Sequence, residues 1–269
     1  MTALALRAAT AVRAPAGPGP GEDDPALLAY FTDLLAPFGQ KPDQDLYRGG
    51  AHLHHRDLVD LLLAADEAVA AARPDLAIVA HALPDLAPFT ATAPYLTARL
   101  GGRATNFALT EQGLAAPFTA LRIAAAYQEA GRAAEVAVAV LEQTTLPTPY
   151  PLTPLVDSAA LLVLRADAGP GPRFAGAHSA DHAGPALAAR LDGPDADGTL
   201  LVLGPHVTDD IPDHPAVHRA EPGSYCTGVW LELARHWQDW QHAHRRVVLC
   251  DTDPRTGRTH LAVFADGEE

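Results

Sequence analysis

Short apolar runs alternate with longer helical stretches along this chain of 269 residues, and this order constrains its fold most strongly. Apolar runs of strand length, typical of strands buried on both faces, lie at 76–80, 136–141, 159–164, 200–203 and 247–250. Stretches with helical spacing lie at 26–36, 55–72, 90–100, 113–130 and 226–244. Strands that alternate with helices require crossover connections, so the sequence predicts an α/β fold.

The order of these elements occurs twice along the chain. Each part contributes a strand, an apolar helix and then two strands, with further strand patterns around Leu4 and Leu6, at 106–110 and at 260–264. This doubling predicts one compact domain of two pseudo-repeated halves, residues 1–165 and 166–269. The run at 136–141 contains no polar residue, so we expect it to form a central strand of a sheet.

Charge and composition exclude several classes of function. The net charge is −14, with 19 basic residues against 33 acidic ones and no basic run, which argues against a nucleic-acid or anionic-membrane partner. Lys41 is the only lysine, which excludes most Schiff-base chemistry and P-loop phosphate binding. Two cysteines, Cys226 and Cys250, make neither a disulfide framework nor a Cys-rich zinc site, so we expect a cytoplasmic protein.

Histidines with metal-compatible spacing occur in two pairs, His178 with His182 and His214 with His218. Both pairs lie in segments rich in Pro and Gly, where this spacing does not place two side chains on one helical face. We therefore favour solvated loop histidines and predict neither a metal nor a cofactor. Three more histidines flank tryptophans on the last predicted helix, where we expect a surface or interface position (His236, His242 and His244).

Four other residues have chemistry that an active site uses. Glu111 and Glu142 follow predicted strands, where a carboxylate acts either as a base or, as we favour, as a structural acid. Cys226 begins a predicted helix, which would lower the pKa of a nucleophilic thiol; the alternative, which we favour, is a small buried residue. Cys250 lies within an apolar strand and is expected in the core.

Several stretches resemble one known family in their order along the chain. They are 75–101 (DLAIVAHALPDLAPFTATAPYLTARLG), 120–131 (ALRIAAAYQEAG), 136–142, 156–164 (VDSAALLVL), and 223–234 followed by 247–264. In this order they resemble the type III β-ketoacyl-acyl carrier protein synthases of the thiolase superfamily. The matches cover most of residues 58–264, and the resemblance implies a thiolase-like layered α/β fold.

The catalytic residues of that family are mostly absent from the matching positions. The resemblance places a nucleophilic Cys at the start of the first long helix, where this chain has Gly113 or Leu114, depending on the register. The neighbouring Gln112 resembles the Gln that replaces Cys in some ketosynthase-like decarboxylases, in a shifted register. Pro205 and His206 match the family's Pro-His step, whereas Ser224 stands where the family has an Asn. Ser224 can donate one hydrogen bond in place of that Asn.

The second half of the chain is also shorter than the family pattern. A single stretch rich in Pro and Gly, between 168 and 200, replaces a longer helical segment. In the family, that segment lines the tunnel for the acyl chain and pantetheine.

Three functions are compatible with these features. The first is a non-condensing partner or acyl-shaping subunit of an active synthase in fatty-acid or polyketide-type biosynthesis. The second is an acyltransferase or thioesterase-like enzyme that uses His206 with Ser224 or Cys226 on a carrier-bound thioester. The third is a stand-alone module that binds a ligand or a carrier protein.

The resemblance also implies a partner chain and an acyl donor. It implies a homodimer, or a heterodimer with an active ketosynthase, that pairs through an edge strand near 136–141. The acyl group would arrive on acyl carrier protein or acyl-CoA. Docking of an acidic carrier protein would need an Arg patch, formed by Arg245 and Arg246 or by Arg255 and Arg258.

Overall fold

The computed structural model describes residues 3–14, 24–86, 88–152, 154–167, 171–192, 196–208 and 210–266. The strands in this part of the chain are β1 (Ala5–Arg13), β2 (Leu76–His81), β3 (Thr105–Leu109), β4 (Glu135–Glu142), β5 (Ser158–Arg165), β6 (Arg173–Ala180), β7 (Thr199–Leu203), β8 (Val217–Arg219), β9 (Arg246–Thr252) and β10 (Thr259–Ala265). The helices are α1 (Pro25–Leu35), α2 (Gln44–Arg48), α3 (His55–Ala65), α4 (Glu67–Ala70), α5 (Thr92–Arg99), α6 (Ala116–Glu129), α7 (Ala183–Leu191) and α8 (Gly228–Ala243). Short 3₁₀ turns lie at 36–38, 113–115 and 196–198.

The strand order confirms the predicted doubling. The strands follow one another as β3-β2-β4-β5-β1-β6-β10-β9-β7-β8, and a single residue pair, Ala5 with Arg173, joins β1 to β6. Counted outward from that junction, both sets of five strands have the same spatial order. Numbered by their order along the chain within each set, the strands lie as first, fifth, fourth, second and third. In each set the second, third and fourth strands are parallel and the fifth is antiparallel to its neighbours. The boundary between residues 165 and 166 stays a prediction.

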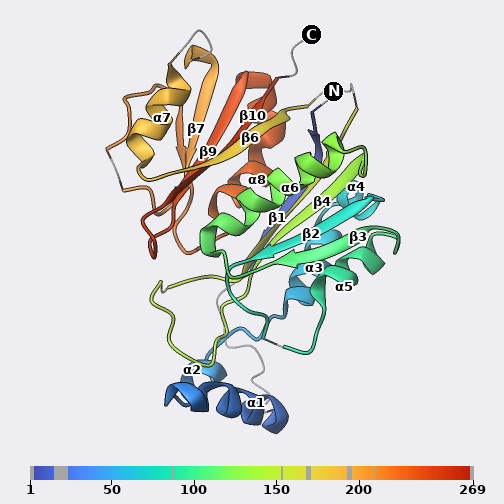
Figure 1. Cartoon of the computed structure of the whole chain (residues 1–269), viewed down its shortest axis with the longest axis vertical. Helices are drawn as coiled ribbons and strands as arrows, with labels where there is room; N and C mark the ends of the chain where they lie inside the picture. Colours follow the sequence, from blue (N-terminus) through green and yellow to red (C-terminus); the bar gives the residue numbers. More distant parts are fainter. Residues whose placement is uncertain are drawn as a thin grey trace.

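Helices α6 and α8 form a central layer between the two sets of strands. Helix α6 contacts β2 and β4 of the first set and also β6 and β10 of the second (Figure 1). Helix α8 belongs to the second half of the chain and contacts β1 and β5 as well as β7 and β9. Helices α3 and α5 cover the other face of the first set, and α7 packs against the second. The N-termini of both central helices are thereby brought to one end of the core.

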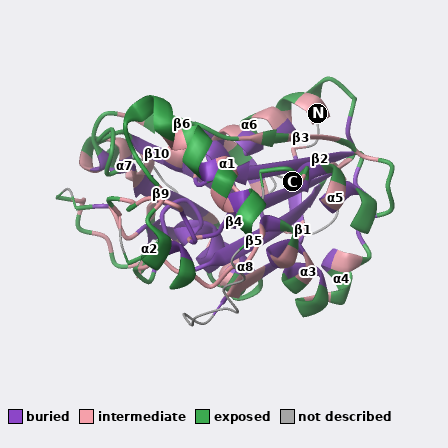
Figure 2. Ribbon diagram, turned by 90° about the horizontal axis from the view of Figure 1, so that it is seen from below, coloured by how far each residue is buried: buried purple, intermediate pink, exposed green. Residues whose placement is uncertain are grey.

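Alternate residues of the strands explain this layering. In β4, Val136, Val138 and Val140 belong to the central core with α6 and α8, whereas Ala137 and Ala139 pack with α3 and α5. Successive side chains of a strand point to opposite faces, so a strand with no polar residue must be covered on both sides. Figure 2 shows these strands buried between helices whose outer faces are exposed.

The prediction of pairing through an edge strand near 136–141 is wrong, since β4 lies inside the sheet, between β2 and β5. The edge strand of this half is β3, which pairs only with β2 among the described strands. The same apolar composition that makes β4 a central strand excludes it from an exposed edge, where unpaired backbone groups need solvent or a partner.

Two segments differ from the sequence-based expectations. The helix expected over 55–72 is two helices, because Asp66 leaves the helical conformation and its side chain accepts the Val69 N–H at 2.9 Å, which caps α4. The Pro/Gly-rich stretch over 168–200 contains strand β6 and helix α7. Strand β6 carries few branched residues, but it pairs with β10 along its whole length, so tertiary pairing outweighs its weak propensity.

A small helical pair, α1 and α2, lies beyond the strand ends at one end of the molecule (Figure 1). Asp24 and Asp43 cap these helices through their side chains, and Leu27, Phe31 and Tyr47 form a separate small core with Leu86. No helix in the described part of the chain has both the length and the apolar character needed to cross a membrane.

Candidate functional site

The space in front of Gly113, at the start of the turn into α6, is already filled. Gly113 has a φ of 54° and the nearby Glu111 a φ of 61°, so the chain turns sharply between β3 and α6. A Cβ atom at Gly113 would lie 2.5 Å from Oη of Tyr225 and 2.7 Å from Oδ2 of Asp253. Real side-chain contacts are not this short, so any side chain here would have to displace that pair.

Tyr225 and Asp253 form a buried hydrogen-bonded pair. The Tyr225 hydroxyl donates to Asp253 Oδ2 at 3.0 Å, and Asp253 Oδ1 accepts the Arg255 N–H at 2.8 Å. Burial, reinforced by the Asp253 charge, raises the pKa of Tyr225 well above its usual value, so the phenol stays protonated as the donor. The ring also lies beside those of Tyr150 and His206, with centroids 6.0 and 6.2 Å away. These contacts hold the phenol against Gly113.

Glu142 holds the loop that carries Tyr225. This fully buried carboxylate at the end of β4 accepts the backbone N–H groups of Tyr225 at 2.8 Å and Cys226 at 2.6 Å. Burial raises the pKa of Glu142 to about 7, although these hydrogen bonds lower it. Glu142 thus has the contacts of a structural acid, whereas Glu111 is exposed.

Asp251 occupies the corresponding place in the other half of the sheet, near the end of β9. Its Oδ1 accepts the backbone N–H of His206 at 3.2 Å and that of Thr252 at 2.9 Å. Burial raises the pKa of Asp251 to about 8. Gly204 packs against this carboxylate so closely that a Cβ atom there would overlap it. Two buried acids on equivalent strands therefore anchor the two loops of the second half that meet at the site.

His206 and Ser224 lie together in this site, where the imidazole contacts backbone and the hydroxyl is buried. Nε2 of His206 lies 3.0 Å from the carbonyl oxygen of Ser224, to which it donates. Burial lowers the pKa of His206, which favours the neutral ring. Ser224 is buried, and its Oγ has no hydrogen-bond partner among the described residues. The imidazole donor is therefore occupied by backbone.

Cys226 is near these residues but lacks the electrostatics of a nucleophile. Its side chain is buried, and the thiol donates to the Leu141 carbonyl at 3.8 Å. Burial and the neighbouring Glu142 raise the pKa of the thiol well above its ordinary value. This is the opposite of the shift that a helix start would produce, because desolvation of a thiolate outweighs the helix dipole here. Cys250 lies in the core within β9, as expected.

We expect both thiols to be unreactive in the native protein. A thiol reagent such as DTNB should label fewer than one thiol per chain under native conditions and two after denaturation, because both side chains are buried and neither forms a disulfide. Measuring absorbance at both conditions tests this. Rapid labelling of Cys226 in the folded protein would restore it as a candidate nucleophile.

The three register positions at which the resemblance places the nucleophile lie in different surroundings. Gln112 is exposed, Leu114 is buried in the central core, and Gly113 alone faces the Tyr225–Asp253 pair. Among the described residues, the structure records no contact between Gln112 and the buried groups of this site.

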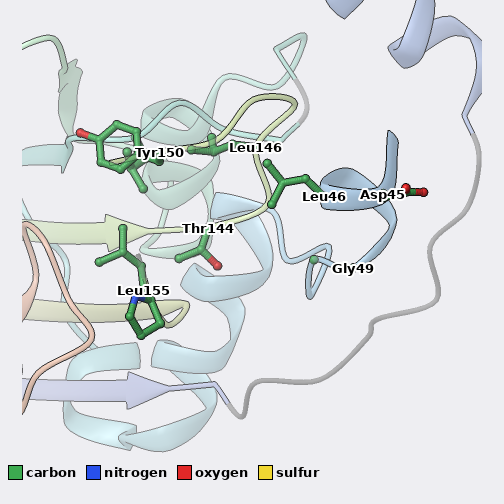
Figure 3. A pocket seen from close by; sticks show the side chains of 10 residues that line it. Asp45, Leu46, Gly49, Thr144, Leu146, Tyr150 and Leu155 are labelled. Carbon is green, nitrogen blue, oxygen red and sulfur yellow. The ribbon is translucent and has the colours of Figure 1, made fainter. Parts of the chain in front are cut away.

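A pocket of about 410 Å³ adjoins the site on the side of α2. Figure 3 shows Asp45, Leu46 and Gly49 from the α2 region on one side, facing a segment that follows β4. That second side is mostly apolar and includes Thr144, Leu146, Tyr150, Pro154 and Leu155. Tyr150 connects the pocket to Tyr225 through their adjacent rings, and Nη1 of Arg255 donates to its hydroxyl at 3.3 Å.

The two arginine pairs proposed as alternatives for carrier docking lie at opposite ends of β9. Arg246 begins β9, with Arg245 just before it, whereas Arg255 and Arg258 lie in the turn that follows β9. A strand of this length separates its two ends by roughly 20 Å. Arg258 also pairs with Asp181 at 3.0 Å. Arg255 is the one of the four that contacts a residue of the pocket.

The two histidine pairs, for which we favoured solvated loop positions, are separated in the fold, with His178 on one strand and His218 on another. His178 lies on β6 and His182 precedes α7, and neither belongs to a potential metal-binding group among the described residues. Nε2 of His214 donates to the Thr199 carbonyl at 2.6 Å, away from His218. Tertiary contacts therefore separate residues that regular spacing had grouped.

Four residues of this site are not predicted from the sequence: Tyr150, Tyr225, Asp251 and Asp253. The two acids could have been found, because Asp251 and Asp253 follow an apolar run in the same way that Glu142 follows another. The two tyrosines carry no such signal, since only folding brings residues 150 and 225 beside Gly113.

Solved structures with a similar fold are found at low sequence identity. The 3-oxoacyl-(acyl carrier protein) synthase III, FabH, of Pseudomonas aeruginosa PAO1 is 17% identical, with a TM-score of 0.64 over 99% of each chain. An OleA variant of Xanthomonas campestris, solved with lauric acid and lauroyl-CoA, is 16% identical, with a TM-score of 0.66 over 98% of this chain and 99% of that one. Cerulenin-bound OleA is 15% identical, with a TM-score of 0.65 over 98% of each chain.

No protein-family model and no curated protein matches the sequence. FabH and OleA are members of the thiolase superfamily, and the structural likeness extends over nearly the whole chain. The chain therefore has the thiolase-like α/β fold, built from two pseudo-repeated halves.

Proposed function

We propose that this protein is a non-condensing, thiolase-fold subunit of fatty-acid or polyketide-type biosynthesis that acts with an active synthase. One observation carries the proposal: at Gly113, one of the register positions where the resemblance places the nucleophile, Tyr225 and Asp253 fill the space that a side chain would need. Covalent catalysis requires a nucleophile with room for the acyl group beside it. The Tyr225 phenol, packed against the backbone of Gly113, supplies neither a nucleophile nor room for an acyl group.

The remaining candidate groups support a non-catalytic role. Cys226 has a thiol whose pKa is raised, and His206 donates to a backbone carbonyl instead of facing an open space. Ser224 is buried, and no described residue lies within hydrogen-bond distance of its Oγ to act as a base. Both loops are held by buried acids, Glu142 and Asp251. The apolar pocket beside Tyr150 is the place where we expect an acyl or pantetheine group from acyl-CoA or acyl carrier protein to contact this subunit.

The edge strand β3 is the surface we propose for the partner chain. Its Thr105 and Ala108 side chains are exposed, and its outer edge pairs with no strand in the described part of the chain. The loop before α5 and strand β3 line one pocket of about 480 Å³, and Phe89 in that loop is 78% exposed. An unpaired strand edge beside an exposed aromatic side chain is suited to extension of the sheet by a second subunit. The cytoplasm stays the predicted compartment.

Co-expression with a thiolase-fold synthase that retains its Cys, encoded in the same genome, tests this proposal. We expect the two chains to co-purify, and intact-mass measurement after exposure to acyl-CoA and malonyl-ACP to show acylation of the synthase alone. Ala108→Arg should abolish co-purification, because it places a charge on the β3 edge. Ala189→Arg, the same change at an exposed position on α7, is the matched control and should leave the complex intact.

Two results would contradict the proposal in different ways. A stable homodimer that ignores every such synthase, yet binds acyl-CoA, would indicate the stand-alone ligand-binding module. A covalent acyl adduct on this chain, or thioester turnover abolished by His206→Ala, would indicate the acyltransferase or thioesterase-like enzyme, and peptide mapping would name the nucleophile.

A further inference from the structure

Three potential metal ligands converge on the side of α8 that faces the outer strand β8. Nε2 of His218, on β8, lies 2.7 Å from Oε2 of Glu232, on α8. Nε2 of His236, one helical turn further along α8, lies 3.6 Å from the same oxygen. All three ligand atoms lie within 4.8 Å of one another. His218 is 14 residues from Glu232 along the chain, and its strand β8 pairs with β7.

The donor set and its dimensions suit a zinc ion. Two imidazole nitrogens and one carboxylate oxygen are a common three-ligand set for Zn²⁺ that leaves a fourth position for water. With bonds of about 2.0–2.2 Å, tetrahedral ligand atoms lie roughly 3.3 Å apart. The two separations from Glu232 Oε2, 2.7 Å to His218 and 3.6 Å to His236, lie on either side of that value. Small side-chain adjustments would therefore bring all three atoms into a tetrahedral arrangement.

Neighbouring side chains hold the three ligands in place. Nη1 of Arg235 donates to Glu232 Oε1 at 3.1 Å, which leaves Oε2 directed toward both imidazoles. The Trp240 ring stacks on His236 with centroids 5.3 Å apart and meets the edge of His218 at 5.2 Å. The Glu232 side chain is only 6% exposed, whereas those of His218 and His236 are 31% and 41% exposed. The site therefore has a buried carboxylate anchor and a face open to an entering ion.

We propose that His218, Glu232 and His236 bind one Zn²⁺ ion that ties the outer strand β8 to helix α8. The site is separate from the Tyr225 region and does not depend on the function proposed above. Strand β8 has only three residues and lies at the edge of the sheet, so a cross-link to α8 would stabilise it. The net charge of −14 favours cations near the surface.

Titration of the untagged, metal-free protein with Zn²⁺, and with Co²⁺ as a spectroscopic probe, tests the site. We expect one ion per chain by calorimetry, visible Co²⁺ absorption of the intensity typical of tetrahedral coordination, and quenching of Trp240 fluorescence by Co²⁺. His218→Ala and His236→Ala should each weaken binding by more than about tenfold, since even loss of a group that only orients a ligand has an effect of that size. Glu232→Gln should do the same.

His242→Ala is the matched control, because His242 is exposed on the same helix outside the cluster, and this variant should bind Zn²⁺ as the parent does. The histidine variants alter partly exposed side chains, and circular dichroism will show that they fold. Binding that all three ligand variants leave unchanged, or no saturable binding of either ion, would overturn the proposal. In that case the cluster would be an ion pair between Glu232 and its neighbours.

Discussion

Replacing Gly113 with alanine is expected to lower the free energy of unfolding by about 3 kcal/mol. Two costs contribute: the strain of alanine in a left-handed backbone conformation, and the overpacked contact that its Cβ atom would make. The new Cβ would lie 2.5 Å from the Tyr225 hydroxyl and 2.7 Å from Asp253 Oδ2, both held in the buried interior. Gly131→Ala is the control for the backbone contribution, because Gly131 has a φ of 67° and no atom of the described residues beyond its chain neighbours lies within 4 Å of its Cβ position. That variant should lose only about 1 kcal/mol.

Denaturant unfolding of both variants, and of each combined with Tyr225→Phe, separates the two contributions. In the presence of Tyr225→Phe, Gly113→Ala should lose about 1 kcal/mol less stability than it does alone, and this difference is the coupling between the two positions. The loss caused by Gly131→Ala should be the same with or without Tyr225→Phe. Equal losses for the two alanine variants would mean that the space beside Gly113 is open. That result would remove the observation on which the non-condensing function rests.

The protein is expected to lose about 3 kcal/mol of stability as the pH rises from 6.5 to 9, at about 1.4 kcal/mol for each pKa unit. Burial raises the pKa of Glu142 to about 7 and that of Asp251 to about 8, so the folded state keeps protons that the unfolded chain has already released. Their stabilisation is fully present below the ordinary carboxyl pKa and is lost as the pH rises through these values. Buried histidines such as His55 and His206 have lowered pKa values and act in the opposite direction, but only below about pH 6.5.

Denaturant unfolding at several pH values in this range measures the slope. Glu142→Gln and Asp251→Asn resemble the protonated acids and should each flatten it, with Asp251→Asn having the larger effect. Glu129→Gln, at an exposed position on α6, should leave the slope unchanged. Stability that is constant or rises between pH 6.5 and 9 would show that both acids are already ionised in the folded protein.

Much of the fold was predictable because the apolar composition of several segments identifies them as strands. The alternation of Val and Ala in β4 predicts a strand covered on both faces, and it has α6 and α8 on one face and α3 and α5 on the other. Strand β6 was not predictable, because its small residues form a strand only when β10 lies beside it. The edge position of β3 likewise follows from strand order, which no local pattern encodes.

The candidate site was likewise predictable from the sequence only in part. The resemblance gave Gly113 as one register position and pointed to His206 and Ser224, while the predicted helix start pointed to Cys226. The structure brings the last three together beside Tyr225. Sequence spacing grouped His218 with His214, whereas the folded chain places His218 against Glu232 and His236. Partners such as these lie far apart along the chain, so no periodicity links them.

By itself, the sequence determined the α/β class, the doubled order of elements and the absence of a cysteine where the resemblance places the nucleophile. Those properties depend on composition and order, which local periodicity reports directly. Only the tertiary structure decided that Tyr225 and Asp253 fill the space at Gly113, and that burial raises the pKa of Cys226. The physical reason is that steric exclusion and desolvation depend on all the atoms around a group, and packing brings those atoms from every part of the chain.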